Sequence, residues 1–227
     1  MKLYVTLALL CVAQALAGPV CRDLNTDINS ATTALGNFNS EVDKYIGNLG
    51  NFRDEITFNI ANRYASIKRN LDSLPLSNET VADLIVAIDN GTKEASDSVF
   101  GGIESLVLVR LEVVKTNAAL QQDLPILGDA TDSLVSQYNT TNDDLLVMSI
   151  NVPGNFVSLD GQIRSAIEGQ SGTPAINILV ELNTITDLLY AQNFIIENTQ
   201  IVYDFRAGLA YEALLVVIEQ AKAGNYC

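Results

Sequence analysis

Two cysteines carry the most definite covalent chemistry in this chain of 227 residues. Cys21 lies near the start and Cys227 is the last residue, whereas Cys11 lies inside an apolar N-terminal stretch. That stretch follows a lysine and ends in small residues at positions 15 and 17, which is typical of a secretory signal peptide. We expect cleavage to remove residues 1–17 with Cys11, and Cys21 and Cys227 to form an intramolecular disulfide after secretion. A disulfide between two chains is the alternative.

Three asparagines stand in the Asn-x-Ser/Thr pattern of N-glycosylation: Asn78, Asn90 and Asn139. On a helix, Asn90 lies about opposite the nearby apolar stripe and Asn139 about 130° from the centre of its own stripe. Asn78 falls in an expected loop. All three are therefore expected to face outward and to accept glycans, with an unused sequon as the alternative at each position.

The chain contains no histidine, which removes Ser-His-Asp and Cys-His catalysis and most zinc sites. Neighbouring acids such as Asp143 and Asp144 point about 100° apart on a helix, so they suit a solvated face and not a catalytic pair. No stretch has the spacing of a phosphate-binding or calcium-binding loop. We expect no enzymatic activity, no cofactor and no metal site.

The charge balance is strongly acidic, with 27 acidic and 13 basic residues and a net charge of −14. Such a surface repels phosphate backbones and anionic membranes, which argues against nucleic-acid binding and lipid docking. After the signal peptide, no apolar run reaches the roughly 18 residues that a transmembrane helix needs. The composition therefore favours an acidic, secreted protein with no transmembrane segment.

The elements that must position these residues are long helices. From Leu24 to Leu74, apolar residues recur at steps of four and three, which is a coiled-coil heptad pattern held for about seven heptads. The pattern is interrupted once, near Ile60, where three successive steps are of four residues. Strands do not have this period, so the stretch predicts one long helical rod.

Prolines divide the chain into four segments of similar length, about 22–74, 79–124, 128–170 and 175–222. Short loops force successive helices to run antiparallel. The sequence thus predicts an all-α, elongated, up-down-up-down four-helix bundle of about 45-residue helices in a single domain, residues 18–227. An even helix count places Cys21 and Cys227 at one end. The fourth segment is the most apolar, and its wide stripe suits a helix packed on two neighbours.

Aligning the four segments by their loops places several helix-breaking residues at mid-height, among them Gly101, Gly102 and Pro153. This predicts a kinked bundle, with an outright break at Pro153 as the alternative. The same alignment brings four aromatic rings to one level, where they either pack against the small residues with no void or line an apolar ligand cavity. These rings are Phe52, Phe100, Phe156 and Phe194.

Together these features predict a secreted, glycosylated, non-enzymatic helical bundle that acts as an extracellular binding or structural module and self-associates through helix faces. The alternative is a carrier of a small hydrophobic ligand in the mid-bundle cavity. A carrier requires a closed apolar pocket. A structural module requires an exposed apolar stripe. The signal peptide, acidity, sequons and helical content resemble secreted proteins of insect gut and haemolymph, although no family motif matches residue by residue.

Overall fold

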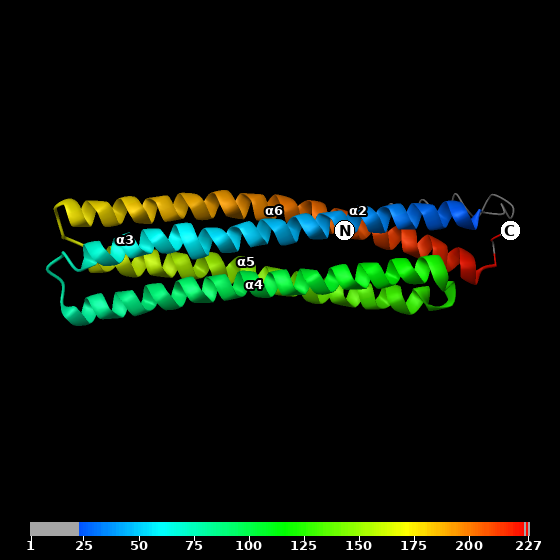
Figure 1. The fold of residues 1–227 in the computed structure, drawn as a ribbon, viewed down its shortest axis with the longest axis horizontal. Coiled ribbons are helices and arrows are strands. Elements are labelled where there is room, and N and C mark those ends of the chain that lie inside the picture. Colours follow the sequence, from blue (N-terminus) through cyan, green and yellow to red (C-terminus); the bar gives the residue numbers. More distant parts are fainter. Residues whose placement is uncertain (1–22, 225, 227) are drawn as a thin grey trace, which may run out of the picture.

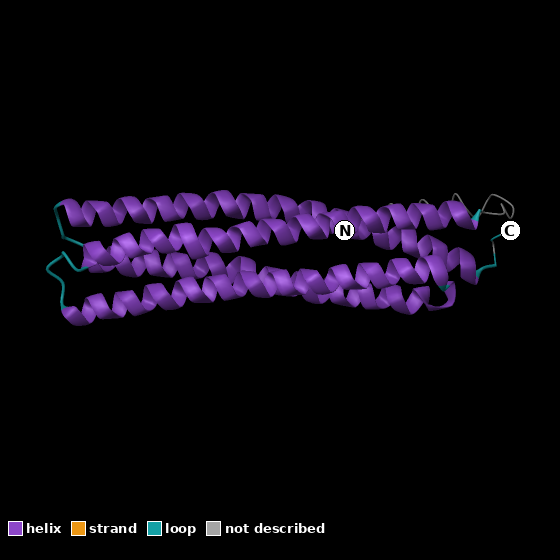
Figure 2. Cartoon of the chain, viewed as in Figure 1, coloured by secondary structure: helices purple, strands orange, loops and turns teal. Residues whose placement is uncertain are grey.

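The computed structural model describes residues 23–224 and residue 226, and these form an elongated bundle of four antiparallel helical rods (Figures 1 and 2). The predicted all-α bundle is confirmed. The predicted signal peptide, Cys21 and Cys227 lie outside the described residues. No helix among the described residues has both the length and the apolar character needed to cross a membrane. The rods have the following bounds: α2 (Leu24–Asp54), η1 (Glu55–Ile60) and α3 (Ala61–Leu71) in the first, then α4 (Asn78–Gln122), α5 (Leu127–Ala166) after the short η2 (Leu124–Ile126), and α6 (Thr173–Lys222).

The helix ends follow the predicted boundaries. The side chain of Asp23 accepts a hydrogen bond from the Asn25 N–H at 3.0 Å, and Ser77 accepts one from the Thr80 N–H at 3.1 Å, so both residues cap helix starts. Before α6, the chain turns through Gly169 and Gly172, whose φ angles of 76° and 95° suit glycine. These local signals therefore set where each rod begins and ends.

The start of α2 and the end of α6 lie at the same end of the bundle (Figure 1). There the Tyr226 hydroxyl donates a hydrogen bond to Asp27 Oδ2 at 3.2 Å. The shared end predicted from an even helix count is therefore confirmed for the described residues.

The interruption in the heptad pattern coincides with η1, which is a π-helix. Its wider turn is visible at the end, where the Ala61 N–H bonds the Ile56 carbonyl five residues back. An α-helix turns once in 3.6 residues, so steps of four would drift off the core face. The wider turn corrects that drift, and the residues four apart all stay buried: Phe52, Ile56, Ile60 and Tyr64.

The four rods do not pack evenly. α4 lies closest to α5, and α2 and α3 pack along α6, whereas α5 and α6 share few contacts. Two glycines of α4 permit the close approach of α5, because a Cβ on Gly91 would meet Leu159 at 2.7 Å and one on Gly102 would meet Met148 at 3.0 Å. α5 runs unbroken through Pro153, so the alternative of a broken helix is wrong. The bundle thus has one loosely packed seam, between α5 and α6.

Candidate functional site

The four rings predicted to meet at mid-height do not gather in one cavity, and this prediction is wrong. Phe52 and Phe156 are each 2% exposed, but Phe100 is 42% exposed and Phe194 is 68% exposed. The loop alignment fixed only the height of each ring along the bundle. The direction depends on helical phase, and Phe100 follows the buried Val99, so it points about 100° away from the core. There the Arg53 guanidinium carbon lies 4.8 Å from the Phe100 ring centroid.

A smaller apolar hollow does lie near the predicted height, in the seam between α5 and α6. Its volume is about 250 Å³, and Tyr64, Pro153 and Phe156 form part of its lining. The Tyr64 and Phe156 rings stack, with centroids 6.3 Å apart and planes inclined by 9°. Burial, with the nearby Asp160 carboxylate as the lesser cause, raises the pKa of Tyr64. The hollow is therefore an aromatic-walled groove that holds one predicted ring of the four.

A second hollow of about 180 Å³ lies further along the same seam. It borders an aromatic cluster in which Tyr203 lies 5.4 Å from Phe38 and 5.5 Å from Tyr138, centroid to centroid. The Tyr138 hydroxyl donates to Asp204 Oδ1 at 2.9 Å. Burial, and secondarily Asp204, raises the pKa of Tyr138 to about 12. This cluster ties α2, α5 and α6 together, so its role is structural.

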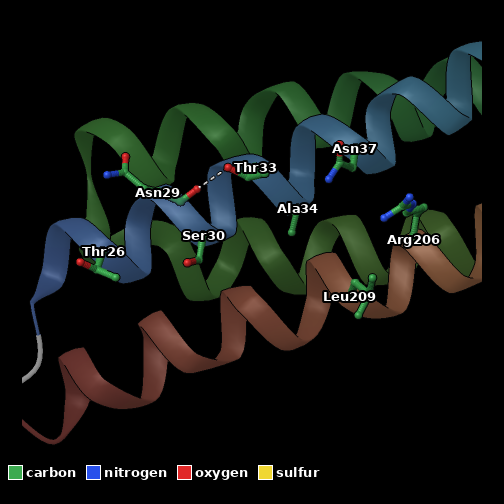
Figure 3. A pocket seen from close by; sticks show the side chains of 8 residues that line it. All are labelled: Thr26, Asn29, Ser30, Thr33, Ala34, Asn37, Arg206 and Leu209. Carbon is green, nitrogen blue, oxygen red and sulfur yellow. Dashed lines mark hydrogen bonds between the residues drawn. The ribbon is translucent and has the colours of Figure 1, made fainter.

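A third hollow, polar and about 510 Å³, lies between the first half of α2 and the last part of α6 (Figure 3). The α2 wall carries hydroxyl and amide side chains, among them Thr33, whose Oγ1 donates to the Asn29 carbonyl at 2.8 Å. Arg206 faces this wall from α6. Seven residues before Arg206 in α6, Thr199 Oγ1 accepts a hydrogen bond of 2.6 Å from the side-chain amide of Asn48 in α2. These polar groups mark the contact between α2 and α6, and they contain no nucleophile paired with a base.

The feature that the sequence analysis missed is the outer face of α6, formed by Tyr190, Phe194, Ile201 and Phe205. These side chains are 73, 68, 67 and 61% exposed. The predicted wide stripe was assigned to packing on two neighbours, yet α6 packs well on the first rod alone. The sequence of α6 is apolar on all sides of the helix, and a contact with one neighbouring rod buries only one side. This property could have predicted an exposed apolar face.

The middle of α6 is also nearly free of charge. From Leu188 to Tyr203 the one charged residue is Glu197, although the chain has 27 acidic residues. The three sequon asparagines are all exposed: Asn78, Asn90 and Asn139. Asn90 lies on α4 and Asn139 on α5, and Asn78, expected in a loop, is instead the first residue of α4, because Ser77 caps the helix there. Outward placement is thus confirmed, whereas occupancy by glycans stays a prediction. The middle of the outer face of α6 therefore carries a single charge, at Glu197, and Asn139 of α5 lies near α6, because it lines the same hollow as Gly208 and Tyr211.

The described residues contain no group of three or more histidine, cysteine or acidic side chains placed to hold a metal ion. Comparison of the chain with models of protein families, with curated proteins and with solved structures found no significant match in any of the three. The chemistry available on these surfaces is apolar contact and hydrogen bonding.

Proposed function

We propose that this protein is a secreted, glycosylated, non-enzymatic bundle that acts as an extracellular structural module and self-associates through the outer face of α6. The observation that carries the proposal is the row of four large apolar side chains, each more than 60% exposed, on one face of a nearly uncharged stretch. Single exposed apolar residues are ordinary on protein surfaces. A row on one face of a highly acidic protein is instead typical of an interaction surface.

Glycans at two of the three sequons would support the same arrangement. Asn78 and Asn90 are exposed on α4, so sugars there would leave α6 uncovered, whereas Asn139 lines a hollow with Gly208 and Tyr211, so a sugar at Asn139 would stand beside α6. Treatment of the secreted protein with a glycosidase is expected to lower its mass by at least one N-glycan. A mass that does not change would contradict the glycosylation.

Sedimentation analysis over a range of concentrations tests the self-association. The wild-type protein is expected to form a dimer or larger species, and Phe194→Glu with Phe205→Glu to shift it to monomer without loss of helical circular dichroism. The matched control is Phe100→Glu, because Phe100 is an exposed ring on α4, which packs mainly against α5 and α2. A wild-type protein that stays monomeric at about 100 µM, far above a micromolar Kd, would overturn the proposal.

The second candidate function is transport of a small apolar ligand in the seam hollow beside Tyr64. The hollow's 250 Å³ exceeds the roughly 150 Å³ of a closed cavity that holds a benzene-sized molecule, but the hollow is a groove and not the closed pocket that a carrier requires. Native mass spectrometry of the secreted protein is expected to show a co-purified ligand if this function is correct. The variant Leu189→Trp would fill the hollow and abolish that ligand, whereas Phe100→Trp would leave it bound.

A further inference from the structure

We infer that two copies of this chain pair antiparallel through the outer face of α6, about a two-fold axis between Glu197 and Asn198. The inference rests on the proposed self-association and adds its geometry. Its first support is the spacing of the exposed row, whose members are four, seven and four residues apart. This spacing reads the same in both directions, so in an antiparallel two-fold pair each large apolar side chain lies against another. Tyr190 then lies against the partner's Phe205, and Phe194 against the partner's Ile201.

The charges on this face separate the antiparallel arrangement from the parallel one. The face carries four exposed carboxylates, at Asp187, Glu197, Glu212 and Glu219. In a parallel pair each of them would lie against its own copy, which gives four like-charge contacts. In the antiparallel pair, Glu197 lies against the partner's Asn198 and Asp187 against the partner's Gly208. Only the two Glu197 carboxylates, which lie on either side of the axis and one residue apart along it, face each other, so this pair has one like-charge contact where the parallel pair has four.

The third carboxylate gains a favourable partner. Glu212 lies against the partner's Asn183 in the antiparallel arrangement, because both are fourteen or fifteen residues from the axis. Asn183 Oδ1 already accepts a hydrogen bond from Arg164 Nη2 at 2.9 Å, so its amide N–H groups point away from that bond and can donate. Arg164 also brings a positive charge next to the place where the partner's Glu212 arrives. Asn183 and Glu212 are both exposed.

The exposed area is sufficient for a stable pair. Beside the row of four, Ile195, Val202 and Leu209 are also exposed on the adjoining side of α6. Since a large aromatic side chain buries about 150–250 Å², these seven side chains together expose on the order of 800 Å². A standard interface takes about 800 Å² from each partner. Asn78 and Asn90 lie on α4, and Asn139 lies on α5 across the seam from Gly208 and Tyr211, at the edge of the face that would be covered.

Photocrosslinking of the full chain tests the geometry. The photoreactive residue p-benzoylphenylalanine, placed at Tyr190, is expected to crosslink to the partner near Phe205. In a parallel dimer it would crosslink near the partner's Tyr190, about 22 Å away along the helix. Mass spectrometry of the crosslinked peptides tells these apart. The same photoreactive residue at Phe100 is the control and is expected to give no crosslinked dimer.

The effect of an added lysine on the dimer Kd gives a second test, because the antiparallel and parallel pairs predict changes of opposite sign. Asn183→Lys places a cation against the partner's Glu212 in the antiparallel pair, so the dimer Kd is expected to fall severalfold. In a parallel pair, lysine would meet lysine and the Kd would rise. A dimer with crosslinks near the partner's Tyr190 and weakened by Asn183→Lys overturns the inference and leaves self-association standing. A monomer overturns both, and a monomer that carries an apolar ligand favours the carrier function.

Discussion

Two adjacent glycines of α4 have different physical roles. A Cβ added to Gly102 would lie 3.0 Å from Met148 Sδ and 3.3 Å from Leu145 Cδ2, whereas one added to Gly101 would meet nothing within 4 Å. Gly102 therefore sets how closely α5 approaches α4, and Gly101 only weakens the helix. Glycine in a helix interior costs about 1 kcal/mol relative to alanine.

The pair gives a matched prediction for stability. Gly101→Leu is expected to raise the free energy of unfolding by about 0.5–1 kcal/mol, because it restores helix propensity in open space. Gly102→Leu is expected to lower it by about 1–3 kcal/mol, because the added side chain overpacks the contact with α5. Urea unfolding followed by circular dichroism measures both. Equal stabilities for the two variants would contradict the assigned roles.

The buried tyrosines predict sensitivity to alkaline pH. Burial raises the pKa of Tyr138 to about 12 and raises those of Tyr45 and Tyr203 as well, with Asp204 as a further cause in each case. In the unfolded chain a tyrosine ionises near pH 10. A folded pKa above the unfolded one gives stability that is complete below about pH 10 and is lost as pH rises through the folded values.

We therefore expect the free energy of unfolding to be flat in the neutral range and to fall from about pH 10 upward. Tyr138→Phe should make that fall shallower, since one phenol no longer ionises on unfolding. The measurement is urea unfolding at a series of alkaline pH values. A wild-type protein whose stability is unchanged up to pH 12 would contradict this explanation.

At the scale of elements, the π-helix η1 explains how the first rod tolerates its broken heptad. Removing one residue between Ile56 and Ile60 would turn the three steps of four into the regular four, three, four. Thr57 is exposed and bonds only the carbonyls of Arg53 and Asp54, so its loss removes no core contact. Deletion is normally severe in a long helix, because all later residues rotate by about 100°.

Deletion of Thr57 is therefore expected to replace the π-helix with regular α-helix and to change the free energy of unfolding by less than about 1 kcal/mol. Deletion of Gly47, an exposed glycine in α2, is the control and should cost more than about 4 kcal/mol, because it turns a regular heptad out of register. Thermal and urea unfolding give both values. If the two deletions destabilise the protein equally, η1 does not compensate for the extra residue.

Periodicity and prolines predicted the rods, their bounds and their direction, because core burial forces an apolar residue every three or four positions. They did not predict where Phe100 and Phe194 point, because equal height along a bundle does not fix rotation about a helix axis. They also assigned the apolar breadth of α6 to packing. Only the three-dimensional structure reveals the sparse contact between α5 and α6.

At the scale of the whole molecule, uneven packing of the rods links the two candidate functions. The tight pairs, α4 with α5 and the first rod with α6, bury most of the core. The loose seam between α5 and α6 leaves the hollow beside Tyr64, and the same one-sided packing leaves the outer face of α6 uncovered. A partner on that face would cover apolar surface that the bundle itself does not bury.

The two ends of the chain are expected to be joined by a disulfide. The hydrogen bond of 3.2 Å from the Tyr226 hydroxyl to Asp27 Oδ2 places the end of the described chain against the first turn of α2, at one end of the bundle. Secretion would place Cys21 and Cys227 in an oxidising environment, so we expect them to form one intramolecular disulfide. That bond would close a loop of about 200 residues, for which the chain-entropy model gives an upper value of roughly 5 kcal/mol.

The expected mass of the secreted chain is therefore two hydrogens below that of the reduced chain, with one crosslinked peptide that joins the two ends. Cys227→Ser should lower the midpoint of urea unfolding, and reductant should lower the wild-type midpoint to the same value while leaving the variant unchanged. Because the bond would act mainly by constraining the unfolded chain, the helical content of the variant should equal that of the wild type. A dimer band that collapses on reduction would instead assign both thiols to a bond between chains, and free thiols at both positions would exclude any disulfide.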